Sequence, residues 1–363
     1  MTSPNTTPLP PPPTISTHTI QMAGLLVDVH GLSDLPPTTT HVSCLWLHHQ
    51  RTRRREDLAG IAARCVGGWN AQVATDLNGK GEGKGKGKGT RGLVALAYDQ
   101  RNHGSRIVDE KANGSWRDGN GRHAVDMLGL VAGMVVDQGV LIDLVQGYLF
   151  PGGEKQIDQH IALGVSLGGH SVWQLLLAEP RVTAGVVVIG CPDYMNLMAD
   201  RARLSKLPTY SAQDAGASFL GSRDFPPSLI QASQKYDPKA IFFGTDPIPD
   251  FSSASNPKSN DDETSRQRQI LHTRLANKKI LLCSGAIDKL VPYRCSEPFV
   301  RWLKQAAGVW WTEEGVEVED RVYEGVGHAF SAEMVRDAVQ FVVGVVAGAD
   351  GEQKGEERGG SKI

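Results

Sequence analysis

Five short apolar runs constrain the fold of this chain more than any other sequence feature. Each run holds four to six residues and shows no alternation with polar residues. Uninterrupted apolar strands are typical of a parallel sheet covered by helices on both faces. The runs are residues 42–47, 93–98, 161–165, 185–189 and 280–283, and the expected helices are 55–65, 122–145, 169–178, 292–305 and 333–346. This order predicts an α/β fold with a doubly wound, mostly parallel sheet.

Several segments lie outside this strand and helix pattern. Residues 19–22 and 25–29 predict a leading antiparallel hairpin, so the core is expected to span 17–193 and 278–348. The Pro/Thr-rich residues 1–16 and the polar residues 349–363 are expected to be disordered, and the Gly/Lys-rich residues 79–89 to form a flexible surface loop. Residues 194–277 lack a convincing strand and predict an inserted helical lid, with a loop of no specific role as the alternative.

The composition argues against several classes of partner. The 363 residues carry 38 Lys and Arg against 40 Asp and Glu, which disfavours a nucleic-acid-binding protein. We expect no membrane span and no secretory signal, and therefore a cytoplasmic protein. The five cysteines are odd in number and widely spaced, so we expect reduced thiols rather than disulfides. We also expect no metal site and no cofactor.

A candidate nucleophile lies in the segment IALGVSLGGH, residues 161–170. The serine, Ser166, ends an apolar strand and begins a helical pattern, with Gly164 and Gly168 two residues away on either side. A sharp strand-to-helix turn needs small residues at both of those positions and projects the serine oxygen above the sheet. The N–H of Leu167 would then point at the same place and could stabilise an oxyanion.

A serine hydroxyl becomes a good nucleophile only when a base removes its proton. His328 is the candidate base, because it lies in a Gly-bounded loop between the last strand and the last helix. Asp288 follows the strand at 280–283 and is the candidate carboxylate that orients the histidine. Asp193, after the strand at 185–189, is the alternative carboxylate.

The loop after the first core strand, LHHQR at residues 47–51, is the expected source of a second oxyanion N–H. Gln50 or His49 would supply it. The cluster Arg51, Arg53, Arg54 and Arg55 that follows is interpreted as a solvated helix face, with attraction of an acidic substrate group as the alternative. We expect the polar residues 99–106 to brace the loop that faces the site.

Aromatic residues in the expected lid could line a substrate pocket. Ligands of open α/β sheets bind at the carboxyl ends of the strands, where this insertion leaves the sheet. Some of its aromatic residues are therefore expected to form an apolar acyl pocket, and the alternative is that they only pack the lid onto the core. The candidates are Tyr210, Phe219, Phe225 and Phe243.

Taken together, these segments resemble the α/β-hydrolase superfamily over roughly residues 17–348. The resemblance rests on GVSLGG around Ser166, SGAIDKLVP around Asp288, GVGHAF around His328, LWLHHQ in the oxyanion-loop place and AYDQRNHGS after the second core strand. The double glycine after the serine is similar to the carboxylesterase and prolyl-oligopeptidase-like branches, although we expect no propeller before the catalytic part. The chain carries His48-His49 where the family usually has His-Gly.

The resemblance implies acyl transfer to water through an acyl-enzyme, without a cofactor. We therefore predict a serine hydrolase that cleaves a carboxylic ester, with a small acyl compound and water as its substrates. Thioesterase or peptidase activity could use the same three residues, since the leaving group is selected by the pocket. A catalytically silent binding protein of the same fold is the alternative from another class.

Overall fold

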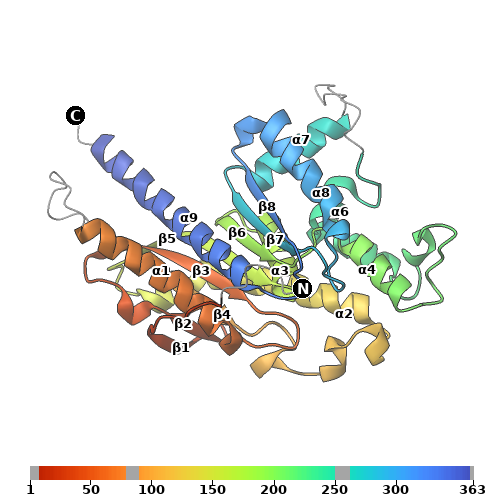
Figure 1. The fold of residues 1–363 in the computed structure, drawn as a ribbon, viewed down its shortest axis with the longest axis horizontal. Helices are drawn as coiled ribbons and strands as arrows, with labels where there is room; N and C mark the ends of the chain where they lie inside the picture. The colour runs from red at the N-terminus through yellow and green to blue at the C-terminus, as the bar shows by residue number, and fades with distance from the viewer. Residues whose placement is uncertain (1–7, 79–89, 250–261, 360–363) are drawn as a thin grey trace.

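The computed structural model describes residues 8–78, 90–249 and 262–359, and the predicted loop at 79–89 lies outside them. Its centre is one eight-stranded sheet in the order β1-β2-β4-β3-β5-β6-β7-β8 (Figure 1). The strands are β1 (Thr17–Met22), β2 (Leu25–His30), β3 (Thr39–His48), β4 (Thr90–Tyr98), β5 (Gln156–Val165), β6 (Val182–Val188), β7 (Lys279–Gly285) and β8 (Glu317–Tyr323). Strands β1 and β2 pair antiparallel, β2 pairs antiparallel with β4, and the other neighbours are parallel. The predicted hairpin and mostly parallel sheet are confirmed.

Helices cover both faces of this sheet, as the uninterrupted apolar strands predict. The α-helices are α1 (Ala59–Asn78), α2 (His123–Leu149), α3 (Leu167–Ala178), α4 (Tyr194–Leu204), α5 (Pro227–Tyr236), α6 (Pro238–Phe243), α7 (Asp262–Leu275), α8 (Tyr293–Gln305) and α9 (Ala332–Gly359). Helices α1 and α9 pack on one face, and α2, α3, α7 and α8 on the other. In β3, Trp46 therefore joins one buried cluster while Leu45 and Leu47 join the other.

The strand register aligns the carboxyl end of β3 with that of β5, and the carboxyl end of β7 with that of β8. His48, at the end of β3, pairs with Gly164 near the end of β5. Gly285, at the end of β7, pairs with Tyr323 at the end of β8. Loops that leave these four strands therefore meet at one edge of the sheet.

The ends of the described chain differ from the expectation of disorder. Residues 8–16 are extended but not detached: Leu9 and Ile15 pack against the cluster under α1, and the Pro10 carbonyl accepts a hydrogen bond from Arg64. Helix α9 continues to Gly359, eleven residues into the expected tail. The Glu, Gln, Lys and Arg residues of this stretch favour a helix, although Gly351, Gly355 and Gly359 do not.

The insertion between β6 and β7 is helical, as predicted, but its parts pack in different places. Leu271 and Leu275 of α7 join the cluster between the sheet and α3, so α7 belongs to the helices that cover the sheet. Helices α4 and α5 contribute instead to a third cluster with the beginning of α2. The expected lid is therefore reduced to the first part of the insertion.

Helix α2 is, among the described residues, long and apolar enough to cross a membrane by length and composition. Over its most apolar window, 56% of the residues are buried inside the fold, as in a core helix. All five cysteines are also buried, and each is a free thiol.

Candidate active site

Ser166 occupies a strained turn between β5 and α3. Its φ of 56° and ψ of −111° fall outside the regions that non-glycine residues usually adopt. A Cβ on Gly164 would lie closer than 3.0 Å to the carbonyl oxygen of Gly168, and a Cβ on Gly168 equally close to that of His48. Both glycines are therefore required by close backbone approach, as the sequence pattern predicts. The turn leaves Ser166 partly exposed at the N-terminus of α3.

His328 lies beside Ser166 and connects it to Asp288. The Ser166 Oγ is 2.9 Å from His328 Nε2, and His328 Nδ1 is 2.8 Å from Asp288 Oδ2. An ionised carboxylate can only accept, so Nδ1–H donates to Asp288 and Nε2 is left as an acceptor for the serine proton. The three residues predicted as nucleophile, base and orienting acid are thus in contact in the predicted order.

Asp288 is itself held in one orientation. Its Oδ1 accepts hydrogen bonds from the N–H groups of Leu290 and Val291, at 2.8 and 3.0 Å. The loop that carries it is tied to the His328 loop, because the Ile287 N–H donates to the carbonyl of Val326 at 3.1 Å. Its side chain is completely buried, so its remaining strong polar contact is with His328.

The alternative carboxylate, Asp193, lies elsewhere. Its Oδ1 accepts from the Asn196 N–H and caps the N-terminus of α4. Burial raises the pKa of Asp193. Within the described residues, its side chain makes no hydrogen bond to a histidine. The structure therefore supports Asp288 as the partner of the histidine.

Two N–H groups are available for an oxyanion next to Ser166. Leu167 and Gln50 both line the cavity that contains Ser166. Within the described residues, no acceptor takes a hydrogen bond from either N–H. His49 does not line the cavity: it is fully buried, its carbonyl accepts from the Gly168 N–H at 3.1 Å, and its Nε2 accepts from the Gln100 N–H at 3.0 Å. Of the two residues expected to supply the second donor, His49 is therefore wrong and Gln50 fits.

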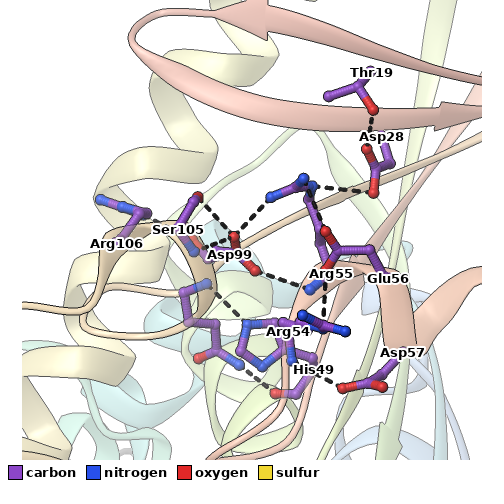
Figure 2. Close-up of polar contacts among 11 residues, drawn as sticks. Thr19, Asp28, His49, Arg54, Arg55, Glu56, Asp57, Asp99, Ser105 and Arg106 are labelled. Carbon is purple, nitrogen blue, oxygen red and sulfur yellow. Dashed lines mark hydrogen bonds and ion pairs between the residues drawn. The ribbon is translucent and has the colours of Figure 1, made fainter. Parts of the chain in front are cut away.

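A buried polar network holds the loop that carries Gln50 (Figure 2). Asp99 accepts from the Arg55 N–H at 2.9 Å, from Arg55 Nη1 at 2.8 Å and from the Ser105 N–H and hydroxyl. Burial alone would raise the pKa of Asp99, but the hydrogen bonds from Ser105 and Arg55 outweigh it and lower the pKa. Arg55 also reaches Asp28 on β2, at 3.1 Å. These contacts are the means by which residues 99–106 can brace the loop. Arg55 belongs to this network and is not a solvated side chain.

The cavity above Ser166 has a volume of about 510 Å³ and lies between two segments. One wall is the connection from β4 to α2, including a short 3-10 turn at Trp116–Asp118, and the other is the end of α4. The residues that line it include Gln50, Arg51, Trp116, Arg117, Asp118, His123, Met127, Ser166, Leu167, Arg201, Leu204, Ser205, Lys289, Leu290 and His328. Of the three expected catalytic residues, Asp288 alone is hidden behind this surface.

The four aromatic residues expected to line the pocket do not line this cavity. Phe219 and Phe225 are fully buried and stack on each other with ring centroids 5.5 Å apart. Phe243 packs against Trp302 at 5.0 Å, on the sheet side of the insertion. Tyr210 packs against the same cluster as Phe219 and Phe225. Burying large rings against each other stabilises the fold more than exposing them in a cavity, and the alternative of packing is the correct one.

Sequence reasoning missed several cavity residues. Trp116 and Met127 give the cavity apolar surface, and Trp116 stacks edge-on against Phe219 at 6.0 Å. Arg201 comes from α4, where Asp200 and Arg203 are also charged, so nothing in the sequence distinguishes this arginine. The Arg51 cluster after β3 could have indicated a cavity residue, since it lies at the carboxyl end of a core strand.

A model of the alpha/beta hydrolase family matches residues 66–342 of this chain. The chain belongs to this family. It is a hydrolase whose eight-stranded sheet, leading hairpin and covering helices agree with the family fold. No curated protein matches the sequence.

Several solved structures are similar to this hydrolase. The protein TT1662 of Thermus thermophilus is 15% identical, with a TM-score of 0.54 over 92% of this chain and 98% of that one. An esterase of Pyrococcus furiosus is 13% identical, with a TM-score of 0.45 over 91% and 90% of the two chains. An S-formylglutathione hydrolase of Agrobacterium tumefaciens is 13% identical, with a TM-score of 0.46 over 91% and 93%. At this identity, the first of these shows a shared fold.

Proposed function

We propose that this hydrolase is a serine esterase, which cleaves a carboxylic ester through an acyl-enzyme intermediate. The observation that carries the proposal is the chain of contacts from Ser166 through His328 to Asp288, built on a strained strand-to-helix turn. A serine, a base within hydrogen-bond reach and a carboxylate that orients the base are the parts that nucleophilic acyl transfer needs.

The proposed reaction begins when Ser166 Oγ attacks the ester carbonyl and His328 Nε2 takes its proton. The carbonyl oxygen becomes an oxyanion, and the N–H groups of Leu167 and Gln50 donate to it. The partial positive charge at the N-terminus of α3 stabilises the same oxyanion. Asp288 holds the imidazole in position and stabilises its positive charge.

Collapse of the tetrahedral intermediate breaks the bond to the alcohol oxygen. His328 gives its proton to that oxygen, the alcohol leaves, and the acyl group stays on Ser166. Water then enters, gives a proton to His328 and attacks the acyl carbonyl. The second collapse releases the acid and returns the proton to Ser166, so the enzyme ends in its starting state.

Labelling with a fluorophosphonate, followed by peptide mass spectrometry, tests the nucleophile. We expect one modified peptide, containing Ser166, and no labelling of the Ser166→Ala protein. Ser171→Ala is the matched control, since Ser171 lies on the same helix but is fully buried and donates to the Leu167 carbonyl. Absence of label in the wild-type protein, or label retained in Ser166→Ala, would contradict the proposal.

The leaving group is tested separately with oxyesters, thioesters and anilides that share one acyl group. We expect hydrolysis of the oxyester with the highest kcat/KM of the three. A higher value for the thioester or the anilide would keep the serine mechanism and change the proposed substrate.

A further inference from the structure

Positive charge dominates the cavity above Ser166. Five basic residues and one carboxylate, that of Asp118, contribute to its lining. The basic residues are Arg51, Arg53, Arg117, Arg201 and Lys289. Asp118 is already engaged, because its Oδ2 accepts hydrogen bonds from the Ser115 N–H at 2.9 Å and from the Ser115 hydroxyl at 2.7 Å. A cavity lined by charges of one sign attracts ligands of the opposite charge.

In the described part of the chain, none of the five basic side chains has a carboxylate partner within salt-bridge distance, although Asp118 is near enough to Arg51 to interact with it electrostatically. Arg51 and Arg201 are distinguished from the other three by their burial. Arg51 Nη1 is buried and has no hydrogen-bond partner among the described residues. A buried N–H donor without an acceptor lowers the stability of the protein, and a ligand that accepts a hydrogen bond from it would remove this cost. The two residues come from opposite sides of the cavity, Arg51 from the loop after β3 and Arg201 from α4.

Neutral groups hold Arg201 in place. Its Nη2 donates to the Leu290 carbonyl at 3.2 Å, and its Nη1 lies 3.0 Å from the Met127 sulfur and 3.4 Å from His123 Nε2. Burial, and then the nearby Arg51 charge, lower the pKa of Arg201 to about 10, so Arg201 stays cationic at neutral pH. The pKa of Arg51 is likewise lowered by burial. Burial also lowers the pKa of His123 to about 3, so this histidine adds no competing charge.

We propose that Arg51 and Arg201 form an anion-binding subsite beside Ser166, and that the substrate is an ester carrying a carboxylate or phosphate group. This inference rests on the proposed esterase function and deepens it. Guanidinium groups bind both anions in bidentate fashion, and an anion between two unpaired arginines offsets their mutual repulsion. Trp116, Met127 and Leu204 would cover the apolar part of the same substrate.

The first test compares two esters of equal chain length, monoethyl adipate and ethyl hexanoate, by continuous titration of released acid. In the wild-type enzyme we expect kcat/KM to be about tenfold or more higher for the charged ester, the value of one charge-assisted hydrogen bond. Arg51→Gln and Arg201→Gln should each lower the ratio of the two kcat/KM values, charged ester over neutral ester, by about tenfold. Arg201→Lys should recover part of it, because the charge is kept. The pair 4-acetoxybutanoate and butyl acetate repeats the test with the charge on the alcohol side.

Arg203→Gln is the matched control. Arg203 lies on the same helix, is exposed and pairs with Asp200 at 2.7 Å outside the cavity. We expect this variant to keep the wild-type preference. Thermal unfolding of all variants checks that the fold is intact.

Inhibition distinguishes the two anions. Hexanoate and hexyl phosphate are measured as competitive inhibitors of ethyl hexanoate hydrolysis, with hexanol as the neutral reference. A lower inhibition constant for hexanoate assigns a carboxylate, and one for hexyl phosphate assigns a phosphate. Inhibition by hexanol equal to both would overturn the subsite.

The outcomes separate this inference from the esterase proposal. Equal kcat/KM for the charged and neutral esters in both pairs, together with labelling of Ser166, would leave the esterase standing and overturn the anion subsite. No turnover of any ester and no labelling of Ser166 would overturn the esterase proposal itself.

Discussion

The Cα of Gly168 lies against the carbonyl oxygen of His48, so close that no side chain can stand between them. The contact joins the first turn of α3 to the end of β3. It is reinforced one residue further on, where the Gly168 N–H donates to the His49 carbonyl at 3.1 Å. The nucleophile turn and the loop that carries Gln50 are therefore fixed relative to each other through backbone atoms alone.

Gly168→Ala is expected to damage this arrangement. The added Cβ must push the β3 loop away from α3, so we expect a loss of about 1–3 kcal/mol in the free energy of unfolding and a fall of about 100-fold in kcat. Gly129→Ala on α2 is the control, since a Cβ added there would meet nothing within 4 Å and alanine favours helix. Urea unfolding and ester hydrolysis measure both effects. An active, stable Gly168→Ala protein would contradict the proposed oxyanion geometry.

Replacing the carboxylate that orients the histidine should be more costly for turnover than for stability. Asp288→Asn keeps the shape, but an amide nitrogen facing His328 Nδ1 favours the wrong tautomer, so we expect kcat to fall by about 10⁴-fold. Asp193→Asn should keep most of the activity, since asparagine can also cap α4. Activity lost in Asp193→Asn and kept in Asp288→Asn would reverse the assignment.

Acid should destabilise this hydrolase through its buried histidines. Burial lowers the pKa of His48, His49 and His160 to about 4. Between pH 6.5 and 4 the unfolded chain binds protons at these sites and the folded chain does not, so stability falls as the pH falls. Each histidine contributes a loss of about 1.4 kcal/mol per pH unit in this window.

Urea unfolding at about pH 7, 6 and 5 measures that slope. His48→Gln should reduce it by the contribution of one proton. A stability independent of pH in this range would mean that these histidines bind protons equally well in the folded and the unfolded chain.

Packing and pocket roles in the insertion can be separated by substitution. Phe243→Ala should cost about 3–5 kcal/mol of stability, because it removes a ring packed on Trp302, and should leave the preferred ester chain length unchanged. Leu204→Ala should change the preferred ester chain length and cost little stability, because Leu204 lines the cavity and is 39% exposed. A graded series of acyl esters and a thermal unfolding curve for each variant provide the measurement. A shifted chain-length profile in Phe243→Ala would restore its expected role in the pocket.

The elements that depend on local patterns could be predicted from the sequence. Buried parallel strands need continuous apolar runs, and the turn at Ser166 needs glycine on both sides, so both leave a local signal. Asp288 and His328 could be identified because each follows a strand that ends at the same edge of the sheet.

The cavity wall could not be predicted in the same way. Phe219 and Arg201 both lie between β6 and β7, but only the packing of the insertion decides that the ring turns inward and the guanidinium faces the cavity. The choice between His49 and Gln50 likewise depends on the contact of His49 with Gln100 and Gly168, which are distant in sequence.

The long separation of Ser166 and His328 in the chain, 162 positions, has a consequence during protein synthesis. A ribosome that has synthesised β5 and α3 has already produced Ser166, the proposed nucleophile, before it synthesises β7, β8 and the loops that carry Asp288 and His328. These strands join the sheet beyond β6, so the serine meets its base only in the last steps of assembly. Until then the Ser166 hydroxyl of the nascent chain has no base to activate it. The time at which hydrolytic activity appears would therefore report when folding is complete.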